Sequence, residues 1–69
     1  MIWVNVDKPL RTCTIHSSNC IFVIRKQETK YKGINKIKRD GGWIPFESLE
    51  EAYKFCEEKF PNYKVRRHC

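Results

Sequence analysis

The sequence predicts an α+β fold, with one amphipathic helix packed on one face of a small, mainly antiparallel sheet of three to four strands. The observations behind it are a single apolar stripe at helical spacing, several short apolar or alternating segments, and a length of 69 residues. A chain of this length forms a single domain, residues 1–69. Its core rarely supplies more than about 3–5 kcal/mol, so a metal ion, a disulfide or a partner is expected to add stability.

The helix is expected over residues 48–60 and is the most strongly marked element. Ser48 is a favourable N-cap, and Glu51 three residues later completes a capping box. One apolar stripe follows at helical spacing, formed by Leu49, Ala52, Tyr53, Cys56 and Phe60. Pro61 ends the helix. We therefore expect Cys56 to lie in the helix–sheet core as a small apolar residue.

The strands are expected on either side of that helix. Ile2, Val4 and Val6 alternate with polar or aromatic residues, which is typical of a half-buried strand. The apolar run 20–24 favours a central strand, and the lysine-rich segment 31–37 favours a weak edge strand. The remaining expectations are a loop over 10–19, a turn at 40–42, a short strand at 43–46 and a last strand at 63–67.

The cysteines and histidines suggest a zinc site that staples the fold. The loop carries a C-x2-H-x3-C pattern, and the chain ends in His68-Cys69. Zinc in structural sites takes four thiolate or imidazole ligands. The candidate ligands are Cys13, His16, Cys20 and Cys69, with His68 as the alternative to Cys69. A disulfide, either Cys13–Cys20 or Cys20–Cys69, and free thiols beside a solvated His16 remain open.

Charge is distributed unevenly along the chain, whose net charge is +6. Residues 25–39 hold seven lysines or arginines against one glutamate, whereas residues 47–58 hold five glutamates against one lysine. A basic segment suits polyanions because phosphate contacts release counterions, although a solvated surface explains it as well. Interleaved aromatic residues suit nucleic acid. The candidate nucleic-acid-binding residues are Lys30, Lys32, Lys36, Lys38, Arg39 and Trp43.

Several classes of protein are disfavoured by what the sequence lacks. It has no run of about 18 apolar residues, so we expect no membrane partner. The first residues do not resemble a signal peptide, which makes the cytoplasm the expected location. There is no glycine-rich phosphate loop, no C-x-x-C pair and no evident acid/base pair. We therefore expect neither an enzyme nor a small-molecule substrate.

The segment 43–55 (WIPFESLEEAYKF) resembles part of a known nucleic-acid-binding family. It is similar to the end of the hybrid-binding domain found at the N-terminus of some ribonuclease H enzymes. The whole chain also resembles short prokaryotic or archaeal α+β proteins. In hybrid-binding domains, lysines and aromatic residues on a three-stranded sheet hold a nucleic-acid duplex, so the resemblance implies a nucleic-acid partner. No binding residue is transferred from it.

Together these patterns predict a small zinc-stapled module that binds nucleic acid through its basic strand region. The alternative is a protein–protein interaction module with no affinity for nucleic acid. In that case Trp3 and Trp43 would anchor the interface, where large aromatic residues are enriched.

Overall fold

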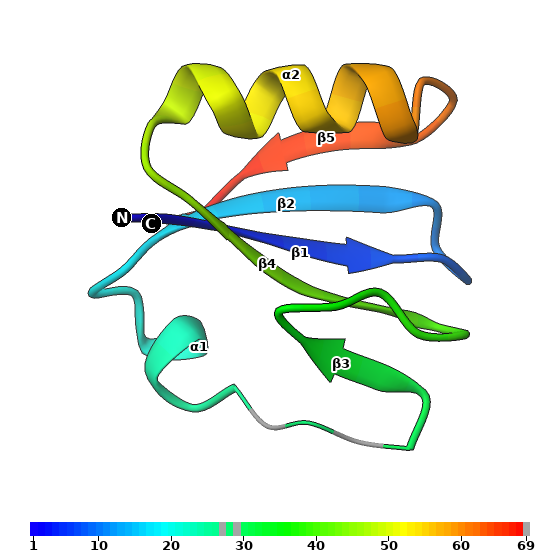
Figure 1. Ribbon diagram of the computed structural model, residues 1–69, viewed down its shortest axis with the longest axis horizontal. Coiled ribbons are helices and arrows are strands. Elements are labelled where there is room, and N and C mark those ends of the chain that lie inside the picture. Colours follow the sequence, from blue (N-terminus) through cyan, green and yellow to red (C-terminus); the bar gives the residue numbers. More distant parts are fainter. Residues whose placement is uncertain (27, 29, 69) are drawn as a thin grey trace.

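The computed structural model describes residues 1–26, 28 and 30–68. Those residues form five strands and two helices. In chain order they are β1 (Ile2–Asp7), β2 (Thr12–Ser17), α1 (Ile21–Ile24), β3 (Lys32–Ile34), β4 (Gly41–Phe46), α2 (Leu49–Lys59) and β5 (Lys64–Arg67). The strands make one sheet in the order β3-β4-β1-β2-β5 (Figure 1). Within the described part of the chain, neither helix is long and apolar enough to cross a membrane.

The α+β class is confirmed, but the sheet has five strands and is mixed. β1 is antiparallel to both of its neighbours, β2 and β4. The outer pairs, β2 with β5 and β3 with β4, are parallel. For β5 the reason is the helical connection. α2 carries the chain back from the end of β4, so β5 runs in the same direction as β4. The β1–β2 hairpin has the antiparallel pairing that we expected for most of the sheet, whereas the connection through α2 lets β5 pair in parallel with β2.

One face of the sheet packs against α2 and holds the main core. Alternation places Val4 and Val6 of β1 on this face, and β2 contributes Cys13 and Ile15. Cys56 of α2 is fully buried against them, which confirms its expected core position. The expected N-cap is also confirmed, because the Glu51 N–H donates to Ser48 Oγ at 3.2 Å.

Two expectations for the segment before residue 25 were wrong. The loop expected over residues 10–19 contains β2, in which Cys13 and Ile15 alternate with polar side chains. The apolar run 20–24, expected as a central strand, forms the single-turn helix α1. The interior positions of the sheet are filled by β4, β1 and β2, so the run packs on a face of the sheet instead. In this turn Cys20 and Val23 are buried, while Ile21, Phe22 and Ile24 are exposed.

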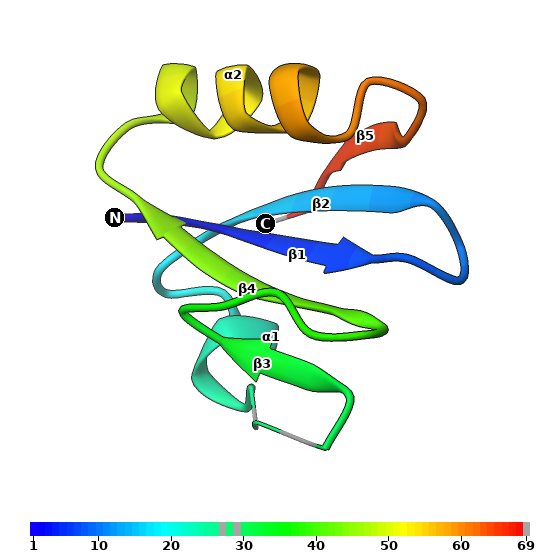
Figure 2. The ribbon, with the colours of Figure 1, turned by 45° about the vertical axis from the view of Figure 1, so that its right-hand side comes forward.

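The second face of the sheet carries a smaller core formed with α1. Cys20, Val23 and Trp43 are buried there, and Trp3 packs against them half-buried. Figure 2 shows α1 beside β3 and β4, with α2 across the sheet from it. Trp3 therefore covers the second sheet face.

The edge and turn between β3 and β4 agree with the sequence. β3 forms one edge of the sheet, as expected for a lysine-rich segment, but it has only three residues. Gly41 opens β4 with φ at 120°, a backbone conformation that favours glycine. A Cβ at this position would also collide with the carbonyl oxygen of Val6. Glycine is therefore required where the turn enters the sheet.

Candidate functional site

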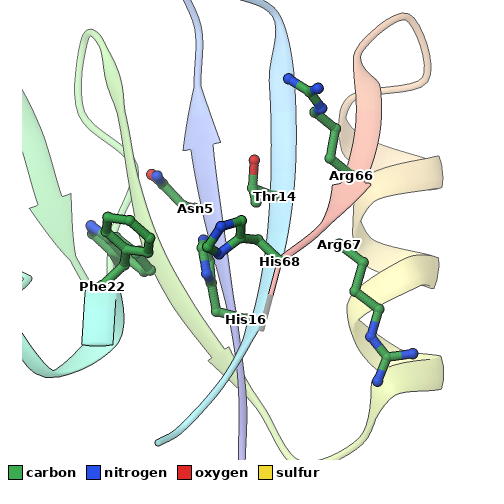
Figure 3. A pocket seen from close by; sticks show the side chains of 8 residues that line it. Asn5, Thr14, His16, Phe22, Arg66, Arg67 and His68 are labelled. Atoms are coloured by element: carbon green, nitrogen blue, oxygen red, sulfur yellow. The ribbon is translucent and has the colours of Figure 1, made fainter. Parts of the chain in front are cut away.

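A cavity of about 450 Å³ opens on the sheet face opposite α2. The register explains its lining: Asn5 of β1 pairs with Thr14 on one side and Trp43 on the other, and Arg66 of β5 pairs with Thr14. Paired residues share a face of the sheet, so all four side chains reach this cavity. The other lining residues are His16, Phe22, Arg67 and His68 (Figure 3).

His16 lies at the centre of the aromatic cluster in this cavity. It is only 4% exposed, and its ring centroid lies 5.2 Å from that of Trp43 and 5.6 Å from that of His68. Phe22 stands against the His68 ring at 5.1 Å. Burial, followed by the neighbouring His68 and Lys32, lowers the pKa of His16. The imidazole is therefore neutral near pH 7, and the solvated His16 left open by the sequence is not what the fold contains.

Cys20 adds a sulfur atom to this cluster. Its Sγ lies 3.4 Å from His16 Nδ1, and both side chains are buried. One ligand-type atom from each of His16, Cys20 and His68 lies within 4.8 Å of the other two. Cys20 is disulfide-bonded. Its partner is not Cys13, which is a free thiol, so the Cys13–Cys20 pairing is excluded.

The structure does not bring all four predicted metal ligands together. Cys13 lies three residues before His16 on the same strand, and alternation therefore puts it on the opposite face. There it is fully buried with Cys56. Burial is the main cause that raises the pKa of Cys13 to about 12. Cys69 lies outside the described residues, whereas His68, the alternative to it, does reach His16.

Most of the predicted nucleic-acid-binding lysines and arginines lie away from the cavity. Lys36 and Lys38 approach Glu28 at 3.8 and 3.4 Å. A hydrogen bond from the Ile34 N–H is the main cause that lowers the pKa of Glu28, and the two lysines lower it further. The positive charge of Lys36 and Lys38 is therefore partly balanced by the Glu28 carboxylate.

Two other members of the predicted set, Arg39 and Lys30, lie against the ring of Tyr31. The Arg39 guanidinium stands 4.0 Å and Lys30 Nζ 5.5 Å from the ring centroid. Arg39 also pairs with Asp40 at 3.4 Å. This group lies around Tyr31, which does not line the cavity.

Trp43 is the member of the predicted set that lines the cavity, and Lys32 lies beside it. Lys32 Nζ stands 5.9 Å from the Trp43 ring centroid. Trp43 itself is only 7% exposed and forms part of the cavity floor. Sequence reasoning missed Phe22, because the run around it was interpreted as a buried strand. It also missed Arg66, although a strand over 63–67 already places Arg66 and Val65 on opposite faces of the sheet.

Asn5 supplies a polar group that the fold leaves unsatisfied. Its Oδ1 atom is buried and, among the described residues, it is the one buried side-chain nitrogen or oxygen without a hydrogen-bond partner. Such a group is costly to bury unless something donates to it. Asn5 lines the cavity, so a bound molecule can provide that donor.

Comparisons with family models, curated proteins and solved structures gave no match to this chain. Function is therefore inferred from the chemistry of the cavity residues.

Proposed function

We propose that this protein binds single-stranded nucleic acid on the sheet face opposite α2. The supporting observation is the cavity of about 450 Å³, which combines exposed rings, cationic side chains and an unsatisfied amide. Small-ligand pockets usually measure about 300–1,000 Å³, so this one is large enough for one nucleotide unit. The rest of the strand would lie along the surface around it.

Phe22 is the best stacking platform at this site. It is 51% exposed and is held by contact with the rings of His68 and His16. A base can reach Phe22 and the exposed His68, whereas the buried Trp43 packs against His16. Stacking on one aromatic ring contributes about 1–3 kcal/mol and tolerates any base, which suits a single strand.

Cations surround this ring cluster on the same face. Arg66 lies at the cavity, Lys32 stands over Trp43, and Lys26 Nζ lies 4.1 Å from the Trp3 ring centroid. The first-turn acidic residues Glu50 and Glu51 are on α2, which covers the other face (Figure 1). Phosphates would therefore meet positive side chains here, and the negative charge of α2 would lie across the sheet.

Asn5 gives the proposed site a contact to a base edge. A carboxamide can both accept from and donate to the edge of a nucleobase. The buried Oδ1 would accept from an exocyclic amino group, which adenine, cytosine and guanine carry and uracil lacks. We therefore expect weaker binding to oligouridylate than to oligoadenylate or oligocytidylate.

Fluorescence anisotropy with labelled oligonucleotides tests this proposal. Phe22→Ala should weaken single-strand binding by roughly 5- to 150-fold, the equivalent of about 1–3 kcal/mol. The matched control is Ile24→Ala on the same helical turn, because Ile24 is 70% exposed and does not line the cavity. A Phe22→Ala protein that binds as tightly as the Ile24→Ala protein would refute the stacking site.

The salt dependence of binding tests the electrostatic part. Arg66→Gln should reduce the slope of log K against log salt by about 0.7 for each phosphate that the arginine neutralises. Lys54→Gln on α2, across the sheet, should leave the slope unchanged. Equal affinity for a duplex, or no affinity for any oligonucleotide at low salt, would contradict the proposal.

Binding of another protein is the second candidate, and the exposed apolar side chains of α1 favour it. Ile21, Phe22 and Ile24 are each at least half exposed on one short turn. Trp43, one expected anchor, is buried, and Lys26 stands over Trp3, the other. A protein interface would therefore centre on α1, and Ile24→Ser would weaken it while leaving oligonucleotide binding intact.

A further inference from the structure

Three ligand-type side chains from separate parts of the chain converge at the cavity. His16 comes from β2, Cys20 stands at the N-cap of α1, and His68 follows β5. Their ligand atoms all lie within 4.8 Å of one another, and the Cys20 Sγ to His16 Nδ1 distance is 3.4 Å. Figure 3 shows the two imidazoles side by side.

These distances suit a zinc ion after a small contraction. Zinc binds imidazole nitrogen at about 2.0–2.1 Å and thiolate sulfur at about 2.3 Å, which puts tetrahedral ligand atoms roughly 3.3–3.6 Å apart. The Cys20–His16 distance of 3.4 Å already falls there. His68 is exposed and follows an edge strand, so its side chain can close the remaining gap of about 1 Å.

The surroundings fix the inner ligands. His16 is 4% exposed and its ring is held between Trp43 and Phe22 at 5.2 and 6.0 Å. Cys20 is 3% exposed, and its backbone N–H donates to the Ser17 carbonyl at 3.0 Å. Two ligands are therefore preorganised in an apolar wall, and His68 supplies the third from the solvent side.

We propose that His16, Cys20 and His68 form a zinc site that exists only when Cys20 is reduced. Cys20 is disulfide-bonded in this structure, and a disulfide sulfur does not bind zinc as a thiolate does. Reduction by a thiol reductant breaks the S–S bond, takes up two electrons and two protons, and oxidises two reductant thiols to a disulfide. Zinc would then displace the proton from Cys20 and bind one ring nitrogen of each of the two histidines.

Three protein ligands would leave a fourth position, which solvent can reach from the cavity that His16 and His68 line. Water satisfies a tetrahedral ion there. The disulfide and the metal would thus be two alternative uses of the same Cys20 sulfur atom. His68 belongs to both proposed sites, but zinc binding itself requires no nucleic acid and can be measured without it.

Zinc titration of tag-free protein, with and without phosphine reductant, tests the proposal in the absence of nucleic acid. Native mass spectrometry should show one zinc ion per reduced chain and none on the oxidised chain. Cobalt substituted for zinc should give a thiolate-to-metal absorption band that is missing in Cys20→Ser. His68→Ala should lower zinc affinity by more than about a hundredfold, beyond the effect of removing a neighbour of a ligand.

Two controls keep the result interpretable. Cys56→Ala removes a thiol from the opposite face and should retain the zinc. Circular dichroism establishes that each variant is folded, and His68 is exposed, so its removal leaves the cores intact. Zinc retained by both Cys20→Ser and His68→Ala, or no zinc on the reduced wild type, would overturn the site. Equal zinc binding by the oxidised protein would overturn its redox dependence. Oligonucleotide binding measured with a chelator present separates these outcomes from failure of the proposed function.

Discussion

The thiols of Cys13 on β2 and Cys56 on α2 share a hydrogen bond inside the core, and neither side chain is exposed. Both are free thiols. Burial in an apolar environment disfavours the thiolate, which raises the pKa of both groups and makes them poor nucleophiles and metal ligands. Two of the four cysteines thus act as small core residues.

We predict that this thiol pair makes the protein less stable at alkaline pH. Cys13 ionises near 9 when unfolded and only near 12 when folded. The unfolded chain therefore releases a proton that the folded chain keeps, so the stabilisation is complete below about pH 9 and is lost as the pH rises toward 12. Urea unfolding at about pH 7 and about pH 10 should show this loss. The loss should be smaller for Cys13→Ala, and identical pH dependence of the two proteins would contradict the assignment.

We also predict that Ile15 and Ile24 contribute very differently to the free energy of unfolding. Ile15 is 1% exposed in the core beneath α2, whereas Ile24 is 70% exposed on α1. Ile15→Ala should lower the free energy of unfolding by about 2–5 kcal/mol, because it removes buried methyl groups and leaves a cavity. Ile24→Ala should change it by less than about 0.5 kcal/mol. Similar values for the two variants in urea unfolding would contradict the described packing.

Local signals predicted the parts of this fold that depend on local chemistry. The cap at Ser48, the burial of Cys56 on the apolar stripe and the alternation of Val4 and Val6 each act within a few residues and are confirmed, but Tyr53, which was expected on that stripe, is 42% exposed. β2 was missed although its signal was present. Cys13 and Ile15 alternate with threonines and His16, but Cys13 had been interpreted as a ligand instead of an apolar residue.

Other features depend on contacts between distant segments. The run 20–24 is rich in β-branched residues, yet β1 already has both neighbours, and the run forms a helical turn on the second face. The cluster at His16 depends on β5 pairing in parallel with β2, which brings His68 over from the other end of the chain. The spacing of cysteines and histidines indicated His16 and Cys20 as candidate metal ligands, but it could not decide between His68 and Cys69 at the end of the chain.

The N-cap of α2 gives a third prediction. Ser48 Oγ accepts from the Glu51 N–H at 3.2 Å, which satisfies one of the unpaired N–H groups at the helix start. Ser48→Ala should therefore lower the free energy of unfolding by about 1 kcal/mol, within a range of about 0.5–2. Ser18→Ala, at an exposed residue between β2 and α1, is the matched control and should have little effect. Equal effects in urea unfolding would show that the cap adds nothing.

The last prediction concerns the end of the chain. The His68 N–H donates to the Ile15 carbonyl at 2.9 Å, which extends the β2–β5 ladder, and its ring packs on Phe22. A net hydrogen bond contributes about 0.5–1.5 kcal/mol and an aromatic pair a similar amount. Deleting residues 68 and 69 should therefore cost about 1–3 kcal/mol, more than the roughly 0.5 kcal/mol typical of surface changes.

Reductant and chelator keep this measurement free of any disulfide or metal ion. Under those conditions His68→Ala retains the backbone donor and loses the ring, so it should be destabilised by less than the deletion. Cys69 was predicted from the sequence to bind metal or form a disulfide, and both are absent here, so Cys69→Ser should match the wild type. A deletion that leaves the free energy of unfolding unchanged would show that the residues after β5 do not hold the edge strand in place.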